Sequence, residues 1–267
     1  MKSTVAGLYD PGNMSARKHS ALAFTLVELL VTIAVISILA VLLFPAIQKG
    51  LVAANRTHCI SNLRNLNTAL AMYYQENNGR FFPYVEDVQG SSHFYIGFEV
   101  TAGSPGDRVL DMTRARLSPY FEHSGGVQTC PTFPYGEGYH LAQFTTPTYA
   151  YGLNAYMLKG TAQNMGSSVQ NFDLIPLPAQ TITWADCALL NTTEGEASPQ
   201  NPMIQEHYIL DAEPTPKFHF RHGGLCTAAF ADGSVRPLNS FFLYPEPDGQ
   251  LGYLQSSGED YLLRLNK

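Results

Sequence analysis

A long apolar segment near the N-terminus, with one carboxylate close to its start, constrains this chain more than any other feature. The segment runs from Ala23 to Gln48, and its last 20 residues, from Leu29 onward, carry no formal charge. A helix rises about 1.5 Å per residue, so this length matches the roughly 30 Å hydrocarbon core of a bilayer. The segment therefore predicts a helix that crosses a membrane once.

Charged residues stand at and before the start of this segment. An ionised Glu28 would cost up to roughly 2.5–3.5 kcal/mol inside a bilayer. The carboxylate needs a partner, and we find none within helical reach in the surrounding sequence. The preceding residues 17–19, Arg-Lys-His, form a basic flank. This flank predicts a cytoplasmic N-terminus and an outward-facing remainder, because basic residues are retained on the cytoplasmic side.

The residues around Glu28 resemble a known signature. Ala23-Phe24-Thr25-Leu26-Val27-Glu28-Leu29-Leu30-Val31 is similar to the prepilin signature of type IV pilins and type II secretion pseudopilins. In that family a prepilin peptidase cuts before the Phe and methylates the new amine. The resemblance implies that residues 1–23 are a cytoplasmic leader and that cleavage falls between Ala23 and Phe24. Family members usually carry Gly where this chain has Ala23.

The resemblance also implies assembly roles for two residues. Glu28 would pair with the amine of Phe24 on a neighbouring subunit inside a filament core, and Pro45 stands where the family has a helix-distorting proline. An ordinary secretory signal is the alternative. Its apolar core spans about 7–15 residues and precedes a small-residue cleavage site. The segment here is longer, and Phe44-Pro45-Ala46 matches such a site weakly.

Beyond Pro45 the helical pattern continues in a more polar register. Apolar residues recur at spacings of three and four, which predicts one buried face; they are Cys59, Leu63, Leu66, Leu70 and Tyr73. The polar residues Asn62, Arg64, Asn65 and Asn67 are expected off this stripe. The predicted helix ends at Asn77-Asn78-Gly79. We therefore expect a transmembrane half at 24–48 and an amphipathic half at 49–79.

The remaining residues, 80–267, predict an extracytoplasmic head of short strands and long loops. The expected strands are His93–Val100, Thr148–Leu153, Thr181–Ala185, Leu225–Ala231 and Ser234–Pro237. Asp232-Gly233 between the last two indicates a two-residue type I′ hairpin. Residues 160–180 and 190–217 are expected to be long loops. The predicted fold is α+β and pilin-like, with a long N-terminal helix packed on an antiparallel β-sheet.

The head also resembles a large group of pseudopilin-like proteins. The carrying residues are a C-x-x-N-L start at Cys59 and an H-x9-D-G mark formed by His222, Asp232 and Gly233. A His and an Asp invite a catalytic or metal interpretation, since a carboxylate orients an imidazole. No nucleophile motif accompanies them, so we favour a turn role for Asp232 and a backbone hydrogen bond for His222.

Four cysteines, Cys59, Cys130, Cys187 and Cys226, are widely spaced without a C-x-x-C pair. In an outward-facing compartment this pattern predicts zero to two disulfides rather than a zinc site. Our hypothesis pairs Cys59 with Cys130 and Cys187 with Cys226. Four buried free thiols are the alternative.

Calcium is the one cofactor that the sequence leaves open. Major pseudopilins bind Ca²⁺ in a loop of the head, and acidic loop residues are present here: Glu194, Glu196, Glu206, Asp211 and Glu213. No D-x-[DN]-x-[DN]-G pattern selects ligands among them, and loop carboxylates are usually solvated. We expect no resident cofactor, and calcium is the alternative.

These features predict a structural subunit rather than an enzyme. The net charge of −6 argues against nucleic-acid binding, where a basic patch is expected. The resemblance implies an inner-membrane protein whose partners are itself, other pilin-like subunits, prepilin peptidase and an inner-membrane assembly platform. A tip-type minor subunit that initiates the filament is a second alternative. The same features are compatible with a secretion pseudopilus, a pilus and a DNA-uptake filament.

The main rival is a membrane-anchored binding module or hydrolase with an aromatic groove. Aromatic residues of the head would line it, including Phe81, Phe82, Phe94, Tyr95, Tyr149, Tyr151 and Trp184. We expect most of these rings in the core instead, since large aromatics are usually buried.

Overall fold

The computed structural model describes residues 25–88, 91–101, 103–124, 126–127, 129–136, 138–159, 171–190, 201, 204–211, 217–243 and 249–254. The chain divides into two compact units, residues 1–48 and 49–267. Ala23 and Phe24 lie outside the described residues, as do Glu194, Glu196 and Glu213.

Helix α1 (Leu26–Glu76) is continuous over 51 residues and includes Pro45. Every large apolar side chain from Leu26 to Leu51 is at least half exposed. This part of α1 is long and apolar enough to cross a membrane. No part of the chain that the structure describes covers these side chains.

The end of α1 agrees closely with the sequence prediction. Asn78 and Gly79 adopt positive φ angles of 54° and 72°, and the Gly79 amide donates to the Tyr74 carbonyl at 2.6 Å. This is a left-handed helix stop, which glycine and asparagine tolerate best. A Cβ atom on Gly79 would lie 2.1 Å from Oδ1 of Asn171, so the position also requires glycine for space.

The buried face of α1 differs from the expected stripe. Its buried residues are Cys59, Asn62, Leu63, Leu66, Asn67, Ala69, Leu70 and Tyr74, whereas Tyr73 is only partly buried. The two asparagines were expected off this face. They are tolerated there because both are hydrogen-bonded: Asn62 Nδ2 donates to Tyr151 Oη at 3.0 Å, and Asn67 Nδ2 donates to the Phe230 carbonyl at 3.0 Å.

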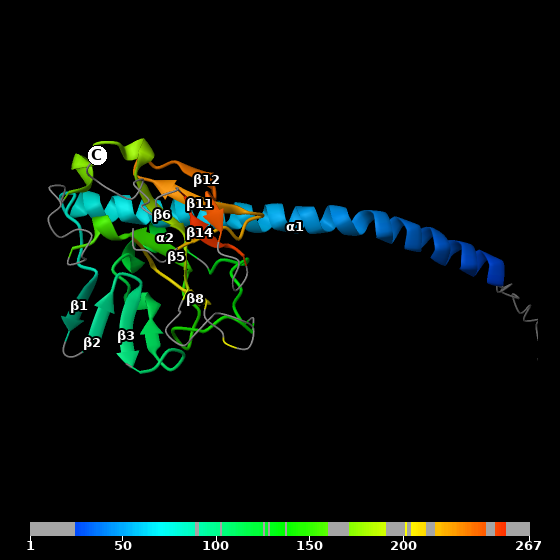
Figure 1. Ribbon diagram of the computed structural model, residues 1–267, viewed down its shortest axis with the longest axis horizontal. Coiled ribbons are helices and arrows are strands. Elements are labelled where there is room, and N and C mark those ends of the chain that lie inside the picture. The colour runs from blue at the N-terminus through cyan, green and yellow to red at the C-terminus, as the bar shows by residue number, and fades with distance from the viewer. Residues whose placement is uncertain are drawn as a thin grey trace, which may run out of the picture. The chain divides into compact units, whose positions relative to one another are not determined.

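A five-stranded sheet packs against this face. Its order is β12 (Val235–Asn239), β11 (Leu225–Phe230), β6 (Ile182–Asp186), β5 (Tyr151–Asn154) and β9 (Ile209–Leu210). All neighbours are antiparallel except β5 and β9. The cyan part of α1 runs along β6 and β11, to which Asn67 is hydrogen-bonded (Figure 1).

Three smaller sheets complete the head. One joins β1 (Val85–Val88), β2 (Ser91–Phe94), β3 (Gly97–Thr101) and β4 (Val109–Asp111). Another has the order β10 (Phe218–His219), β14 (Leu251–Tyr253) and β13 (Phe242–Leu243), and the last pairs β7 (Ala188–Leu190) with β8 (Ile204–Glu206). Short helices lie between the strands: η1 (Met112–Arg114), α2 (Ser118–Ser124), η2 (Ala155–Met157), η3 (Phe172–Leu174) and η4 (Pro178–Gln180). The α+β, pilin-like fold class is confirmed.

The strand predictions have mixed outcomes. Those for β6, β11 and β12 are confirmed to within two residues at each end. The single strand at His93–Val100 is wrong, because Tyr95 and Ile96 form a turn between β2 and β3. The strand expected from Thr148 begins only at Tyr151, because Ala150 has a φ of 55°, which breaks an extended chain.

The hairpin between β11 and β12 is present, but its turn type was predicted wrongly. Ala231, Asp232 and Gly233 form a three-residue loop closed by Phe230 and Ser234, and only Gly233 has a positive φ, of 88°. Asp232 Oδ1 accepts hydrogen bonds from the Ser234 amide and hydroxyl at 2.9 and 2.7 Å. These local bonds hold Asp232 outside the left-handed region that a type I′ turn requires.

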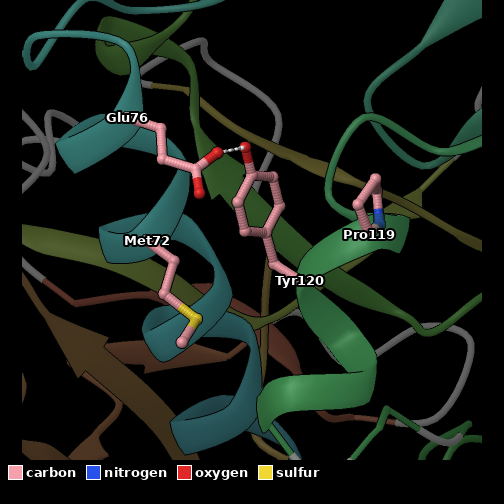
Figure 2. A pocket seen from close by; sticks show the side chains of 4 residues that line it. All are labelled: Met72, Glu76, Pro119 and Tyr120. Carbon is pink, nitrogen blue, oxygen red and sulfur yellow. Dashed lines mark hydrogen bonds between the residues drawn. The ribbon is translucent and has the colours of Figure 1, made fainter.

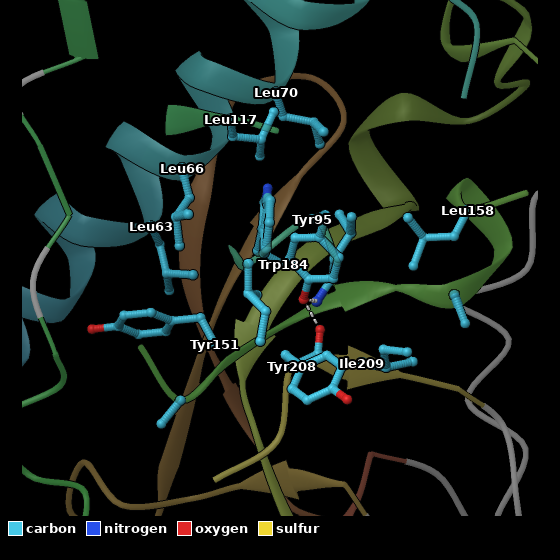
Figure 3. Close-up of a cluster of buried hydrophobic side chains, with 14 of the residues drawn as sticks. Leu63, Leu66, Leu70, Tyr95, Leu117, Tyr151, Leu158, Trp184, Tyr208 and Ile209 are labelled. Atoms are coloured by element: carbon cyan, nitrogen blue, oxygen red, sulfur yellow. Dashed lines mark hydrogen bonds between the residues drawn. The ribbon is translucent and has the colours of Figure 1, made fainter. Parts of the chain in front are cut away.

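Trp184 of β6 lies at the centre of the core. Leu63, Leu66 and Leu70 of α1 surround its ring together with Tyr95, whose centroid lies 5.6 Å away (Figure 3). The Tyr95 hydroxyl donates to the Tyr208 carbonyl. Trp184 is the only tryptophan in the chain, so its fluorescence reports unfolding of the head.

We predict that Asn67→Ala destabilises the head through lost buried hydrogen bonds. Asn67 Oδ1 accepts from Thr183 Oγ1 at 2.7 Å, so alanine strands this hydroxyl as well as the Phe230 carbonyl. The free energy of unfolding of the full chain should fall by about 2–3 kcal/mol, measured by Trp184 fluorescence in denaturant. Thr68→Ala is the control, because Thr68 bonds only within α1 and is exposed. Equal effects from the two variants would contradict this role of Asn67.

Candidate functional site

The first functional feature is the start of α1, where Thr25 and Glu28 form a capping box. Glu28 Oε2 accepts from the Thr25 amide at 2.9 Å and from its hydroxyl at 2.7 Å, while the Glu28 amide donates to Thr25 Oγ1 at 3.2 Å. These reciprocal bonds satisfy amides that the first helical turn leaves open. The expectation that Glu28 has no partner within reach is wrong, because Thr25 is a neutral partner one turn earlier.

The second feature is a buried polar cluster in the head. It brings together the side chains of Cys59 from α1, Cys130 from the loop after α2, Asp186 at the end of β6 and His222 from the turn between β10 and β11. One ligand atom from each side chain lies within 4.8 Å of all the others, and all four residues are buried. The four positions are far apart in the sequence, so only the fold brings them together.

All four cysteines of the chain are free thiols, so neither hypothesised disulfide is present. Cys59 and Cys130 do meet, with their sulfurs 2.9 Å apart, whereas a disulfide needs about 2.05 Å. Cys187 and Cys226 direct their thiols to the carbonyls of Ile209 and Asp186 instead. The backbone acceptors of the core hold these two thiols.

Arg221 crosses the cluster and neutralises its negative charge. Its guanidinium donates to Cys130 Sγ at 3.1 Å, to Asp186 Oδ1 at 2.8 Å and to the Ala150 carbonyl at 2.7 Å. Burial would lower the pKa of Arg221, but Asp186 and Cys130 outweigh it and raise that pKa. A buried guanidinium with this many acceptors fixes the positions of the groups that it contacts.

The two neighbouring thiols have opposite protonation preferences. A hydrogen bond to Cys130 and burial raise the pKa of Cys59. Burial would also raise the pKa of Cys130, but its hydrogen bond with Cys59 and the charge of Arg221 outweigh it and lower that pKa. The pKa values of the two thiols therefore shift in opposite directions.

His222 presents an unsatisfied nitrogen to this cluster. Its Nδ1 lies 3.4 Å from Thr132 Oγ1, and its Nε2 lies 3.3 Å from Asp186 Oδ2. The second contact is off the hydrogen-bond direction, so Nε2 is buried without a hydrogen-bond partner among the described residues. Burial would lower the pKa of His222, but Asp186 and Cys130 outweigh it and raise that pKa to about 9.

The structure does not join His222 to Asp232, although the H-x9-D-G mark links them in the sequence. Asp232 and Gly233 serve the hairpin turn, as expected, and the carboxylate of Asp232 bonds Ser234. The backbone hydrogen bond expected of the His222 side chain is wrong, because that side chain faces Asp186 and Thr132. Asp186 and Arg221 were missed, since nothing in the local sequence marks them.

Two residues of the acidic calcium candidates are described, and they do not share a site. Glu206 is fully buried and its Oε2 lies 2.8 Å from His140 Nε2. Asp211 pairs with Lys217 at 2.6 Å. These carboxylates are neither solvated nor directed at one another, so this pair gives no support to the calcium alternative.

Most of the residues that would line the hypothesised aromatic groove lie in the core instead. Phe81, Phe82, Phe94, Tyr95, Tyr151 and Trp184 are all buried, which confirms the expectation for most of the named rings.

A small surface pocket lies between α1 and α2, lined by Met72, Glu76, Pro119 and Tyr120 (Figure 2). The Tyr120 hydroxyl donates to Glu76 at 2.6 Å, and this bond with partial burial raises the pKa of Tyr120 to about 12.

Comparison with protein families matches residues 18–44 to a model described as the prokaryotic N-terminal methylation motif. No curated protein and no solved structure matches the chain. The chain therefore carries a prepilin-type N-terminal methylation signature, which supports a type IV pilin- or pseudopilin-like precursor. The motif implies processing by prepilin peptidase and assembly into pilin-like filaments, and with the apolar α1 it is consistent with anchoring in the inner membrane. The match does not extend to the H-x9-D-G mark.

We predict that Arg221→Met destabilises the head strongly, because it leaves the carboxylate of Asp186 buried and unpaired. Breaking such a pair costs about 3–5 kcal/mol in free energy of unfolding, measured by Trp184 fluorescence of the full chain in denaturant. Arg116→Met is the matched control, since Arg116 pairs with the half-exposed Glu86 and should cost less than about 1 kcal/mol. A loss at Arg221 no larger than at Arg116 would contradict this role.

Proposed function

We propose that this protein is a structural, non-enzymatic subunit of a type II secretion pseudopilus or type IV pilus-like filament. The observation that carries the proposal is the exposed apolar surface of α1 from Leu26 to Leu51, which overlaps the prepilin-type signature at residues 18–44. This surface is stable in a bilayer before assembly and against other helices afterwards. Lipid and helix contacts are similarly apolar, so the transfer costs little.

Processing and topology follow from the same segment. Prepilin peptidase cuts between Ala23 and Phe24 and methylates the Phe24 amine, while the basic flank before the cut keeps the leader in the cytoplasm. The head, residues 80–267, is then displayed in the periplasm. The protein crosses the inner membrane once, and an inner-membrane assembly platform draws the subunits out.

Glu28 exchanges partners during assembly. In the single chain its carboxylate caps α1 through Thr25. In the filament the same carboxylate pairs with the methylated amine of Phe24 on a neighbouring subunit, and this pair sets the register of the helices. A charged amine is a stronger partner than a hydroxyl in an apolar filament core.

The buried cluster supports a structural role over a catalytic one. Its thiols, imidazole and carboxylate resemble a nucleophile with its base, but Cys130 is fully buried. A substrate could therefore not reach this sulfur without a rearrangement of the head. The cluster acts in holding the head together.

We predict that assembly depends on the charge of Glu28 and not on its cap. Glu28→Gln keeps a capping box but removes the charge, and Glu28→Val removes both, so both variants should insert, be cleaved and lose most filament yield. Thr25→Ala removes the cap but keeps the carboxylate, so it should assemble nearly as well as wild type. Filaments sheared from cells are quantified against total membrane subunit. Wild-type yield from Glu28→Gln would refute the charge pair.

We predict that the leader is removed only in cells that contain prepilin peptidase. Intact mass and the N-terminal residue of the membrane-extracted protein should show a chain that begins at N-methylated Phe24. Ala23→Phe should retain the leader because the bulky side chain blocks the peptidase, and Ala23→Gly is the matched control that should be cut at least as well. Cleavage elsewhere, or without the peptidase, would overturn the proposed processing.

A further inference from the structure

The geometry points to a structural zinc(II) site in the head, formed by Cys59, Cys130, Asp186 and His222. The inference is independent of filament assembly, because all four residues lie within the unit formed by residues 49–267. It replaces the sequence-based expectation that these cysteines form disulfides rather than a metal site.

The donor set fits zinc better than other divalent cations of proteins. Two sulfurs, one imidazole nitrogen and one carboxylate oxygen lie within 4.8 Å of one another. Zinc takes four such ligands as a tetrahedron, at about 2.3 Å for sulfur and about 2.0–2.2 Å for nitrogen and oxygen. Calcium and magnesium prefer oxygen ligands and do not select thiolates.

The donor atoms of the cluster lie around a shared centre, and one of them has no hydrogen-bond partner. The sulfurs of Cys59 and Cys130 lie 2.9 Å apart, and Nε2 of His222 is buried without a hydrogen-bond partner among the described residues. A buried nitrogen of this kind is rare in protein interiors and needs a cause. A cation bound by both sulfurs and by Nε2 would give this nitrogen a partner.

Hydrogen-bonding groups around the ligand side chains orient them, as the outer shell of a metal site does. Asp186 keeps its second oxygen on Arg221, and the Thr227 amide donates to Oδ2 at 2.6 Å. Nδ1 of His222 faces Thr132 Oγ1, which leaves Nε2 for the metal. Such outer contacts orient ligands and set their protonation in known metal sites.

The electrical charge of the filled site balances. Two thiolates and the Asp186 carboxylate carry three negative charges, and zinc with the Arg221 guanidinium carries three positive charges. Because the cluster is buried, a neutral sum avoids the cost of an isolated charge in a low-dielectric interior. The donors are also closed to solvent, as in structural rather than catalytic zinc sites.

The consequence for the protein is a link between distant parts of the head. Cys59 belongs to α1, whereas the other ligands come from a loop, a strand and a turn that follow it by 71 residues or more. Zinc at this position ties the helix to the sheet without a disulfide. The head should therefore be more stable with zinc than without it.

The test is the metal content and thiol state of the full-length protein, purified in detergent without chelator or reductant. Elemental analysis should find about one zinc per chain, and intact mass after denaturation should show four free thiols. Zinc removal by a chelator should lower the thermal midpoint followed by Trp184 fluorescence, and added zinc chloride should restore it. Cobalt(II) in place of zinc should give the thiolate charge-transfer band of a tetrahedral site.

Substitutions of the ligand residues test which side chains bind the zinc. Cys59→Ser, Cys130→Ser and His222→Gln should each lose most of the bound zinc and weaken the cobalt band. Cys187→Ser is the matched control, because Cys187 is equally buried and a serine hydroxyl can keep its hydrogen bond to Ile209. It should keep about one zinc per chain.

Three results would overturn the site. They are a Cys59–Cys130 disulfide in metal-free protein, four free thiols without metal even after zinc chloride is added, and zinc that survives in the Cys59→Ser/Cys130→Ser double variant. If the donor variants fail to fold, the metal content, thiol state and cobalt spectrum of the wild type still decide.

Discussion

The buried carboxylate of Asp186 is the constraint on which the head depends. A charge without solvent must be matched by fixed groups, and Arg221, the Thr227 amide and His222 all face it. These partners come from the segment that joins β10 to β11 and from β11 itself, and Arg221 extends the same network to Cys130 and to Ala150. The left-handed conformation of Ala150 is held by this network, since its carbonyl accepts from both Arg221 and the Cys187 amide.

Helix α1 meets two different requirements along one continuous element. Its first half exposes apolar side chains, which are stable only in lipid or against other apolar helices. Its second half buries leucines against Trp184 and asparagines against the sheet. The asparagines matter because hydrogen bonds have direction: they set the register of the helix on the sheet, which leucine packing alone leaves loose.

The local sequence pattern was sufficient to predict those elements that neighbouring residues determine. The end of α1 follows from an Asn-Gly pair, and β11 and β12 follow from a turn between two β-type runs. The local pattern gave wrong element boundaries where contacts with distant residues determine the backbone conformation. The turn at Tyr95 and Ile96 sits in a segment of strand-like composition, and Tyr95 is drawn into the core beside Trp184. The stop before β5 depends on Arg221, more than seventy residues later in the chain.

By itself, the sequence determined the membrane-length apolar segment, the prepilin-type signature around Glu28 and the α+β class, because these depend on composition and on spacing within a few helical turns. Only the tertiary structure decided that Cys59, Cys130, Asp186 and His222 meet and that no disulfide joins the cysteines. Their contact follows from the packing of α1 on β6 and of the loop after α2 beside them. The chain supplies no spacing rule for such a meeting, since residues far apart in sequence become neighbours only when the whole core closes.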